Sequence, residues 1–259
     1  MKTLAASVLA LFLSAGCFGQ AKKNVPTASF IKDTLYPATA LLYSQDSDGG
    51  MHMRCTATAI DLKDGVTTFA TAAHCGCEDD TEKKTVSPAK DVVFYITTDD
   101  ADDKVFEKAS VTGCGYRHRG DDFMLLAVKS KKQIPVVSLG TDPQIMDQVV
   151  NVASPLGLGK QVFVGSVSSA DLDRPVVEDD INWSHVVLLQ MFGVNGGSSG
   201  SSVVCVEQQK ICGFVVGSIG GSTMTVMPVS RLKAVQSGIA DKSYKHWIAD
   251  PDAPAPEKK

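Results

Sequence analysis

The sequence predicts an all-β protein, and three observations support this fold class. Short segments rich in valine, isoleucine, phenylalanine and threonine follow one another along the chain. Turn-forming stretches such as DLKDG, TTDDADD and PLGLGK separate them, a spacing that is typical of barrels and sandwiches. Only residues 230–239 carry a convincing helical periodicity. The length of 259 residues fits one large all-β domain or two compact halves.

The predicted elements follow in chain order, and each strand carries the β-branched or aromatic residues that pack on a pleated surface. The strands are residues 66–72, 92–97, 123–128, 148–153, 161–168, 185–191, 202–207, 211–218 and 224–228. In the helix that follows, Leu232, Val235 and Ile239 recur at helical intervals, and we expect Ser230 to cap its start. The proline-rich, charged tail 249–259 is expected to be disordered. No internal repeat is visible.

The first residues, MKTLAASVLALFLSAGCFGQA, have the layout of a secretory signal. Lys2 precedes an apolar run that is too short to span a bilayer as a stable helix. We therefore expect residues 1–21 to be a signal peptide and the protein to be exported, to a periplasm or to the extracellular space. A lipoprotein signal that ends at Gly16, with lipid on Cys17, is the alternative, although Ser14 stands where a lipobox has an aliphatic residue.

Composition and charge exclude several classes of protein. A hydrophobic content of 44% is enough for a sizeable core, so disorder is not the default. The net charge of −4 is mild, and the lysines and arginines are scattered rather than gathered on one stripe. We therefore expect no nucleic-acid surface.

Six cysteines remain when Cys17 is set aside, and an even number in an exported chain predicts three disulfides. They are Cys55, Cys75, Cys77, Cys114, Cys205 and Cys212. Many pairings are open at this point, and the cysteine positions alone do not choose among them. The one-residue spacing of Cys75 and Cys77 is unlike a zinc motif and has no C-x-x-C partner, so we expect no metal site.

Three fragments carry the candidate chemistry. TTFATAAHCGC is an apolar strand that delivers His74, and GDDFMLLAV places Asp121 and Asp122 directly before a second apolar strand. An acid at the mouth of a buried strand can accept a hydrogen bond from an imidazole. VNGGSSGSSV offers hydroxyl groups among glycines that permit a tight turn. Each fragment alone has an ordinary interpretation: a structural histidine, loop acids and a flexible linker.

Together, the order His74, Asp122, Ser199 resembles the chymotrypsin-like and trypsin-like serine proteases. TAAHC matches the family's histidine motif, and DFMLL matches its acid motif, which selects Asp122 over Asp121. GSSGS matches its serine motif except at Ser198. NVASPLGLGKQVFVGSVSS and MPVSRLK are most similar to the catalytic domain of high-temperature-requirement (Deg-type) bacterial proteases. The resemblance covers about residues 55–239 and includes no PDZ module.

The resemblance implies a fold and a reaction. The fold is two six-stranded antiparallel β-barrels with a C-terminal helix and the site between the barrels, in a protease domain of residues 22–248. The reaction is peptide-bond hydrolysis by a serine endopeptidase acting on proteins or peptides without a cofactor. His74 would be the base, Asp122 would orient it, and Ser199 would be the nucleophile. The backbone N–H groups of Gly197 and Ser199 would form the oxyanion hole.

The resemblance also implies a specificity pocket. Gly193 would lie at its base, with Gly217, Ser218 and Ile219 along its wall. Because no carboxylate falls at the base, we expect a modest apolar pocket that prefers small to medium aliphatic side chains. Ser198 replaces the aspartate that pairs with a newly cut amino terminus in zymogen-activated relatives, so activation by amino-terminal insertion is not expected.

The family's cysteine pattern implies that Cys55 pairs with Cys75. We further predict pairs Cys77–Cys114 and Cys205–Cys212, the last across a hairpin that turns near Gln208 and Gln209. The rival to the enzyme hypothesis is a catalytically latent or silent binding protein that keeps this fold in the cell envelope. A silent relative has no chemical need for all three residues of the triad, which favours the enzyme.

Overall fold

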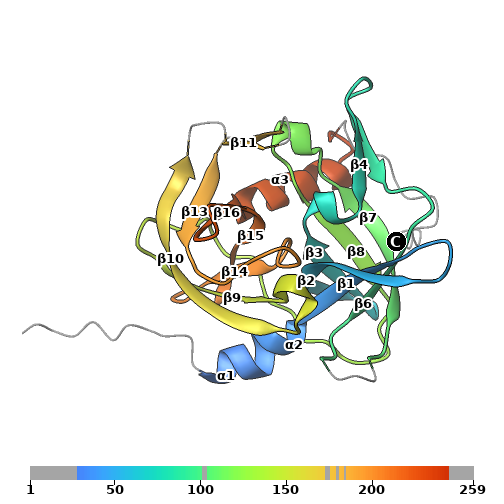
Figure 1. Cartoon of the computed structure of the whole chain (residues 1–259), viewed down its shortest axis with the longest axis horizontal. Helices are drawn as coiled ribbons and strands as arrows, with labels where there is room; N and C mark the ends of the chain where they lie inside the picture. Colours follow the sequence, from blue (N-terminus) through green and yellow to red (C-terminus); the bar gives the residue numbers. More distant parts are fainter. Residues whose placement is uncertain (1–27, 101–103, 173–175, 179–180, 184, 245–259) are drawn as a thin grey trace, which may run out of the picture.

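The computed structural model describes residues 28–100, 104–172, 176–178, 181–183 and 185–244. Within these ranges the chain forms two closed, six-stranded antiparallel β-barrels, which Figure 1 shows side by side. This confirms the predicted all-β class and the two barrels. The predicted signal peptide 1–21, with the candidate lipid site Cys17, and the tail 249–259 lie outside the described residues.

The two barrels share one topology. The N-terminal barrel closes in the order β1-β2-β3-β8-β7-β6 and the C-terminal barrel in the order β10-β13-β16-β15-β14-β9. Numbered within each barrel, both orders read 1-2-3-6-5-4 around the circle, so the fold contains a repeat that the sequence does not reveal. The N-terminal strands are β1 (Thr39–Gln45), β2 (Met51–Lys63), β3 (Val66–Thr71), β6 (Val93–Thr97), β7 (Glu107–Cys114) and β8 (Met124–Val128). The C-terminal strands are β9 (Gln148–Ala153), β10 (Gln161–Leu172), β13 (Val186–Gln190), β14 (Ser202–Cys205), β15 (Lys210–Ile219) and β16 (Thr223–Pro228).

Smaller elements lie outside the barrels. Two two-stranded sheets are formed by β4 (Cys77–Asp80) with β5 (Thr85–Pro88), and by β11 (Val176–Glu178) with β12 (Ile181–Trp183). Three single helical turns occur in connections: η2 (Ala73–Cys75), η3 (Arg117–Arg119) and η4 (Pro155–Gly157). Among the described residues no helix is long and apolar enough to cross a membrane.

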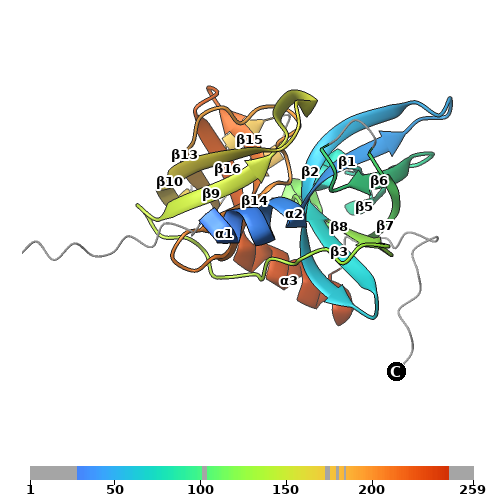
Figure 2. The ribbon, with the colours of Figure 1, turned by 90° about the horizontal axis from the view of Figure 1, so that it is seen from below.

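The nine predicted strands correspond to β3, β6, β8, β9, β10, β13, β14, β15 and β16 and differ from them only at their ends. The barrel strands β1, β2 and β7 and the short strands β4, β5, β11 and β12 were not predicted from the sequence. Neither was the helical segment before β1, which consists of α1 (Ala28–Phe30), η1 (Ile31–Leu35) and α2 (Tyr36–Ala38). Leu35 in this segment is fully buried, and Figure 2 shows α1 and α2 beside the C-terminal barrel.

The predicted helix is α3 (Val229–Ala240), but the expected cap is wrong. The residue at the N-cap position is Pro228, whose side chain cannot accept a hydrogen bond. Ser230 lies inside the first turn, and its backbone N–H donates to Asp142 Oδ1 at 2.8 Å. A carboxylate from a distant loop therefore satisfies one of the free amide groups at the start of the helix.

One apolar core continues from barrel to barrel. The larger cluster of buried side chains includes Phe69 and Leu126 from the first barrel and Val150 and Phe214 from the second. Phe214 meets Phe123 edge to face, with ring centroids 5.9 Å apart, and both rings are almost completely buried. Such pairs add about 0.5–1.5 kcal/mol to the gain from burial. Because Phe123 follows Asp122 directly, this contact fixes the candidate acid relative to the second barrel.

We predict that Phe214→Ala lowers the free energy of unfolding by about 3–5 kcal/mol, because it leaves a cavity at the junction of the barrels. The matched control is Phe106→Ala, since Phe106 also meets an aromatic ring edge to face, that of Tyr43, but is 38% exposed. We expect the control to cost less than about 1.5 kcal/mol. Urea unfolding followed by circular dichroism measures both, and equal losses would contradict a shared core between the barrels.

Candidate active site

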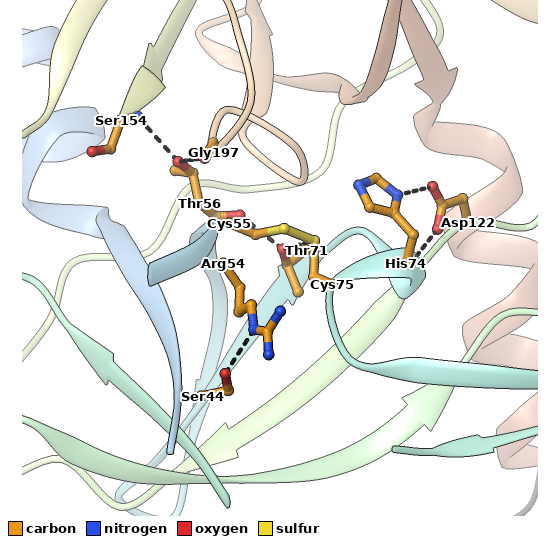
Figure 3. Close-up of a disulfide and its surroundings, with 10 residues drawn as sticks. All are labelled: Ser44, Arg54, Cys55, Thr56, Thr71, His74, Cys75, Asp122, Ser154 and Gly197. Atoms are coloured by element: carbon orange, nitrogen blue, oxygen red, sulfur yellow. Dashed lines mark hydrogen bonds and ion pairs between the residues drawn. A yellow bond between two sulfur atoms is a disulfide. The ribbon is translucent and has the colours of Figure 1, made fainter. Parts of the chain in front are cut away.

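His74 lies in the single turn η2, directly after β3. Its ring Nδ1 is 2.7 Å from Asp122 Oδ2, and its backbone N–H donates to Asp122 Oδ1 at 2.8 Å. The Asp122 side chain is fully buried, whereas that of His74 is 29% exposed. Both oxygens of one buried carboxylate are therefore used to hold one histidine, as Figure 3 shows. A carboxylate that bonds Nδ1 fixes the orientation of the ring, and Nε2 remains available to accept a proton.

Asp121 has a different environment from Asp122. Tyr244 donates its hydroxyl to Asp121 Oδ2 at 3.0 Å, and Arg231 Nε lies 3.2 Å from Asp121 Oδ1. Burial and the neighbouring carboxylate raise the pKa of Tyr244, so its hydroxyl remains protonated as a donor. The two adjacent acids thus have different structural contacts. Asp122 contacts His74, and Asp121 ties its loop to α3 and the segment that follows.

A glycine permits the sharp loop that presents these acids. The Gly115 N–H donates to the Phe123 carbonyl at 2.6 Å, closing the loop. A Cβ on Gly115 would clash with the backbone carbonyl of Asp121. Only glycine therefore lets the two sides of the loop approach this closely.

Ser199 lies at the tip of a tight turn between the barrels. The Ser198 N–H donates to the Asn195 carbonyl at 2.9 Å, and the Ser199 carbonyl accepts the N–H of Thr56 at 3.0 Å. A Cβ on Gly200 would clash with the Thr71 hydroxyl, so the chain passes tightly against the end of β3. Because η2 begins two residues after Thr71, Ser199 lies beside the segment that carries His74. Its side chain is half-buried.

The peptide unit before Gly197 has a fixed orientation. The Gly196 carbonyl accepts the Leu156 N–H at 2.7 Å, and the described chain contains no cis peptide bond. In a trans peptide the N–H points opposite to the carbonyl, so the Gly197 N–H points away from Leu156. Neither this N–H nor that of Ser199 has a hydrogen-bond partner among the described residues. Two unpaired donors in one tight turn are able to bind an anionic oxygen.

Thr56 is the contact that the sequence analysis missed. Its hydroxyl donates to the Gly197 carbonyl at 2.8 Å and accepts the Ser154 N–H at 3.1 Å. With the bond from its own N–H to the Ser199 carbonyl, Thr56 holds two loops of the second barrel, the serine turn at two residues and the β9–β10 connection at Ser154. Nothing in the sequence distinguishes it from other strand threonines, because its partners are about 100 and 140 positions away. Its only signal in the sequence is that it follows Cys55, a residue predicted to form a disulfide.

The four predicted pocket residues lie on two neighbouring segments. Gly193 has a φ of +88°, and a Cβ there would lie 2.9 Å from the Phe163 ring. Gly217, Ser218 and Ile219 form the end of β15, where they pair with β16 on one side. On the other side the pairing with β14 stops at Phe214, so the end of β15 offers an edge without a strand partner among the described residues. Ile219 is 43% exposed there.

Among the described residues, three disulfides join the predicted pairs Cys55–Cys75, Cys77–Cys114 and Cys205–Cys212. The first ties β2 to η2 next to His74 (Figure 3). One group among the described residues has the spacing of metal ligands, and it consists of Cys55, His74 and Cys75. Since the disulfide consumes both thiols, no thiolate remains there to bind a metal.

Comparison with known proteins identifies the family. The model of the trypsin-like peptidase domain matches residues 55–217, more than half of the chain. The chain belongs to the trypsin-like peptidase family. This confirms the predicted resemblance and agrees with the two barrels described above. No curated protein matches the sequence of this peptidase significantly.

Solved structures share the fold of this peptidase. The active form of the protease Rv3671c from M. tuberculosis has a TM-score of 0.59 and 18% identity, over 83% of this chain and 88% of the other. The inactive form of Rv3671c, solved as a serine-to-alanine mutant, has the same TM-score and 14% identity, over 83% of this chain and 92% of the other. The HtrA-type protease AlgW, solved with a tripeptide, has a TM-score of 0.60 and 18% identity. This chain covers 64% of AlgW, and 83% of this chain is matched.

We predict that Gly197→Ala destabilises the peptidase by about 1–3 kcal/mol, because φ at Gly197 is +93° and a Cβ would lie 2.6 Å from the Ser154 carbonyl. Gly196→Ala is the matched control, since a Cβ there meets nothing within 4 Å and φ is not positive. Chemical denaturation compares the two variants. Equal stability of both would show that the loop is not held in the described conformation.

Proposed function

We propose that this peptidase is a serine endopeptidase in which Ser199 is the nucleophile, His74 the general base and Asp122 the residue that orients it. The observation that carries the proposal is the buried Asp122 carboxylate, which uses both oxygens to hold His74 beside the serine turn. A buried carboxylate with no other described hydrogen-bond partner is costly to keep unless its contact with the histidine has a use. Family membership and the protease structures that share the fold support the same conclusion.

The reaction follows from these positions. His74 Nε2 accepts the Ser199 hydroxyl proton as Oγ attacks the scissile carbonyl, and Asp122 stabilises the imidazolium that forms. His74 then gives this proton to the leaving amine, and an acyl-enzyme remains on Ser199. A water molecule, deprotonated by the same imidazole, releases the acyl group and restores the hydroxyl.

The unpaired N–H groups of Gly197 and Ser199 would bind the oxygen that becomes negative during attack. These donors belong to a turn that is fixed by Thr56 and Leu156 before substrate arrives, so they need little reorganisation. A single donor of this kind contributes about 100-fold or more to the rate of acyl transfer. The proposal therefore assigns the glycines of this turn a geometric role rather than that of a flexible linker.

The open edge of β15 supports a peptide as the substrate. An extended peptide can add to an unpaired strand edge through main-chain hydrogen bonds, while its side chains enter neighbouring pockets. The edge lies next to the nucleophile, since the Gly200 N–H donates to the Val215 carbonyl at 2.7 Å. We propose that β15 aligns the acyl side of the substrate and that Gly193, Gly217, Ser218 and Ile219 line the pocket for its terminal side chain.

We also propose that the protein works in an oxidising compartment after export. Three disulfides in a chain of this size are typical of exported proteins and rare in reducing cytosol. Activation would not use a released amino terminus. Position 198 is a serine, which has no carboxylate to pair with an ammonium group. Ser198 is fully buried, and its hydroxyl oxygen lies 3.4 Å from the Asn195 N–H.

We predict that a fluorophosphonate probe labels Ser199 in the wild-type protein, and that His74→Ala abolishes the label because no base remains to activate the hydroxyl. Peptide mapping by mass spectrometry identifies the modified residue. Ser198→Ala is the matched control, since this neighbouring serine is buried, and we expect the label to stay on Ser199. A folded wild-type protein that takes no label would contradict the enzyme and favour the silent binding protein.

We predict that cleavage of a peptide library occurs after small or medium aliphatic residues. The pocket segment offers glycines, Ser218 and Ile219, and Gly193 carries no charge at the expected base. Sequencing of the cleaved peptides measures this preference. A strong preference for lysine or arginine at the cleavage position would overturn the assignment of the pocket.

A further inference from the structure

Lys160 is a buried cation at the boundary between the two barrels. Its side chain is 2% exposed, and its Nζ donates to three backbone carbonyls, those of Tyr36 at 3.0 Å, Thr39 at 3.2 Å and Thr98 at 2.8 Å. The Nζ also lies 4.4 Å from the centre of the Tyr36 ring and 3.9 Å from Asp100 Oδ2. All three donors of the ammonium group are therefore used, and all three bonds leave the barrel to which Lys160 belongs.

The backbone of Lys160 is held by the same residues. Its N–H donates to Asp100 Oδ1 at 3.2 Å, and its carbonyl accepts the Tyr36 hydroxyl at 3.3 Å. The single proton of the Tyr36 hydroxyl is shared with Asp100 Oδ2, which is the closer acceptor at 2.5 Å, and burial together with this bond raises the pKa of Tyr36 to about 12. Tyr36, Asp100 and Lys160 thus form a closed cluster, which we call the lysine clamp.

Burial of the Lys160 ammonium group costs free energy, so the lysine clamp fixes the position of the loop more than it adds to stability. Burial lowers the pKa of Lys160, and the Asp100 and Asp99 carboxylates act in the opposite direction. Removing an ammonium group from water costs several kcal/mol, which carbonyl contacts repay only in good geometry. Such a group tolerates few alternative arrangements, because any shift of the loop would leave a buried charge without its partners.

The loop that Lys160 closes also contacts the candidate oxyanion hole. Lys160 ends the connection between β9 and β10, and Leu156 in the same connection donates its N–H to the Gly196 carbonyl at 2.7 Å. The part between them has little packing of its own. Leu156 and Leu158 are 69% and 72% exposed, and a Cβ on Gly157 or Gly159 would meet nothing within 4 Å. The loop is therefore held mainly at its ends, by Ser154 on Thr56 and by Lys160 in the clamp.

We propose that Lys160 is a positioning residue for catalysis, which anchors the 154–160 loop so that Leu156 keeps the Gly197 N–H aimed at the oxyanion. This inference rests on the proposed serine endopeptidase function. It assigns the helical segment before β1 a role as a fixed internal support, since Tyr36 supplies one of the three carbonyls, and Thr39, the first residue of β1, supplies another. Orientation of the hole would then depend on a lysine within the chain instead of on a released amino terminus.

The test compares Lys160→Met with Lys132→Met in the full-length protein. Methionine keeps an unbranched apolar body of four atoms and removes the ammonium group. Lys132 borders the same region but is 57% exposed, and it pairs with Asp99 at 2.9 Å, so its replacement removes a surface ion pair outside the clamp. Peptide hydrolysis gives kcat and KM, and circular dichroism and urea unfolding give the folded fraction of each variant.

We expect Lys160→Met to lower kcat about 10-fold or more per folded molecule, with KM within about 3-fold of wild type, because one oxyanion donor is misaligned. Lys132→Met should keep both constants. The low-field proton resonance of the His74–Asp122 hydrogen bond should persist in Lys160→Met, since that pair belongs to the other barrel's loops. A folded Lys160→Met with wild-type kcat would overturn the proposal, as would a loss of activity that only matches the unfolded fraction.

Tyr36→Phe provides a second, milder variant if Lys160→Met does not fold. It removes the hydroxyl that joins Asp100 to the Lys160 carbonyl and keeps the aromatic ring under the ammonium group. A fall in kcat at constant KM supports the clamp, and an unchanged kcat overturns it. The wild-type protein separates the two proposals. If it shows neither labelling nor hydrolysis, the endopeptidase function fails and this inference with it, whereas an active wild type with active variants excludes only the role of Lys160.

Discussion

The site depends on the hydrogen bonds that Thr56 makes across the junction of the two barrels. His74 and Asp122 come from the loops of one barrel, and Ser199 comes from a turn of the other. A reaction between them requires the barrels to keep their register to within fractions of an ångström. Apolar contacts such as Phe123 with Phe214 hold the barrels together but do not fix direction. Thr56 supplies directional contacts beside the nucleophile turn, because it bonds Ser199, Gly197 and Ser154. The buried pair of Thr58 with Ser202 and the bond from Lys160 to Thr39 add further directional contacts between the barrels.

Rigidity around this junction has a covalent part as well. The Cys55–Cys75 disulfide links the residue before Thr56 to the residue after His74. Thr56, which bonds Ser199, and His74, which bonds Asp122, are therefore linked by a short covalent path through this disulfide. Glycines complete the arrangement where a side chain would collide, at Gly115 behind the acid and at Gly200 behind the serine. The local features, namely the disulfide and the glycines, and the long-range hydrogen bonds of Thr56 therefore favour the same arrangement of the site. Such agreement between local and long-range interactions is typical of a well-determined fold.

Sequence patterns predicted the strands that are rich in large apolar and β-branched residues. β8 and β15 are rich in valine, leucine, isoleucine and phenylalanine, whereas β2 and β7 carry alanine and lysine, with glycine in β7. In a small closed barrel the inward residues of such strands are short because there is little room inside. Propensity scales undervalue these residues, so the strands were missed. The cap of α3 failed for another reason, since Asp142, which is distant in sequence, took the place of the expected Ser230.

Candidate residues divide in the same way. His74, Asp122 and Ser199 were predictable because each lies in a local motif, whereas Thr56 and Lys160 matter only through partners in other parts of the fold. Lysine is rarely buried in proteins, and no neighbouring residue in the sequence marks Lys160 as an exception. Its burial results from Tyr36, Thr39 and Thr98, which three-dimensional closure brings together. The residues proposed to react can thus be read from short motifs, whereas the residues proposed to position them follow from contacts between distant parts of the chain.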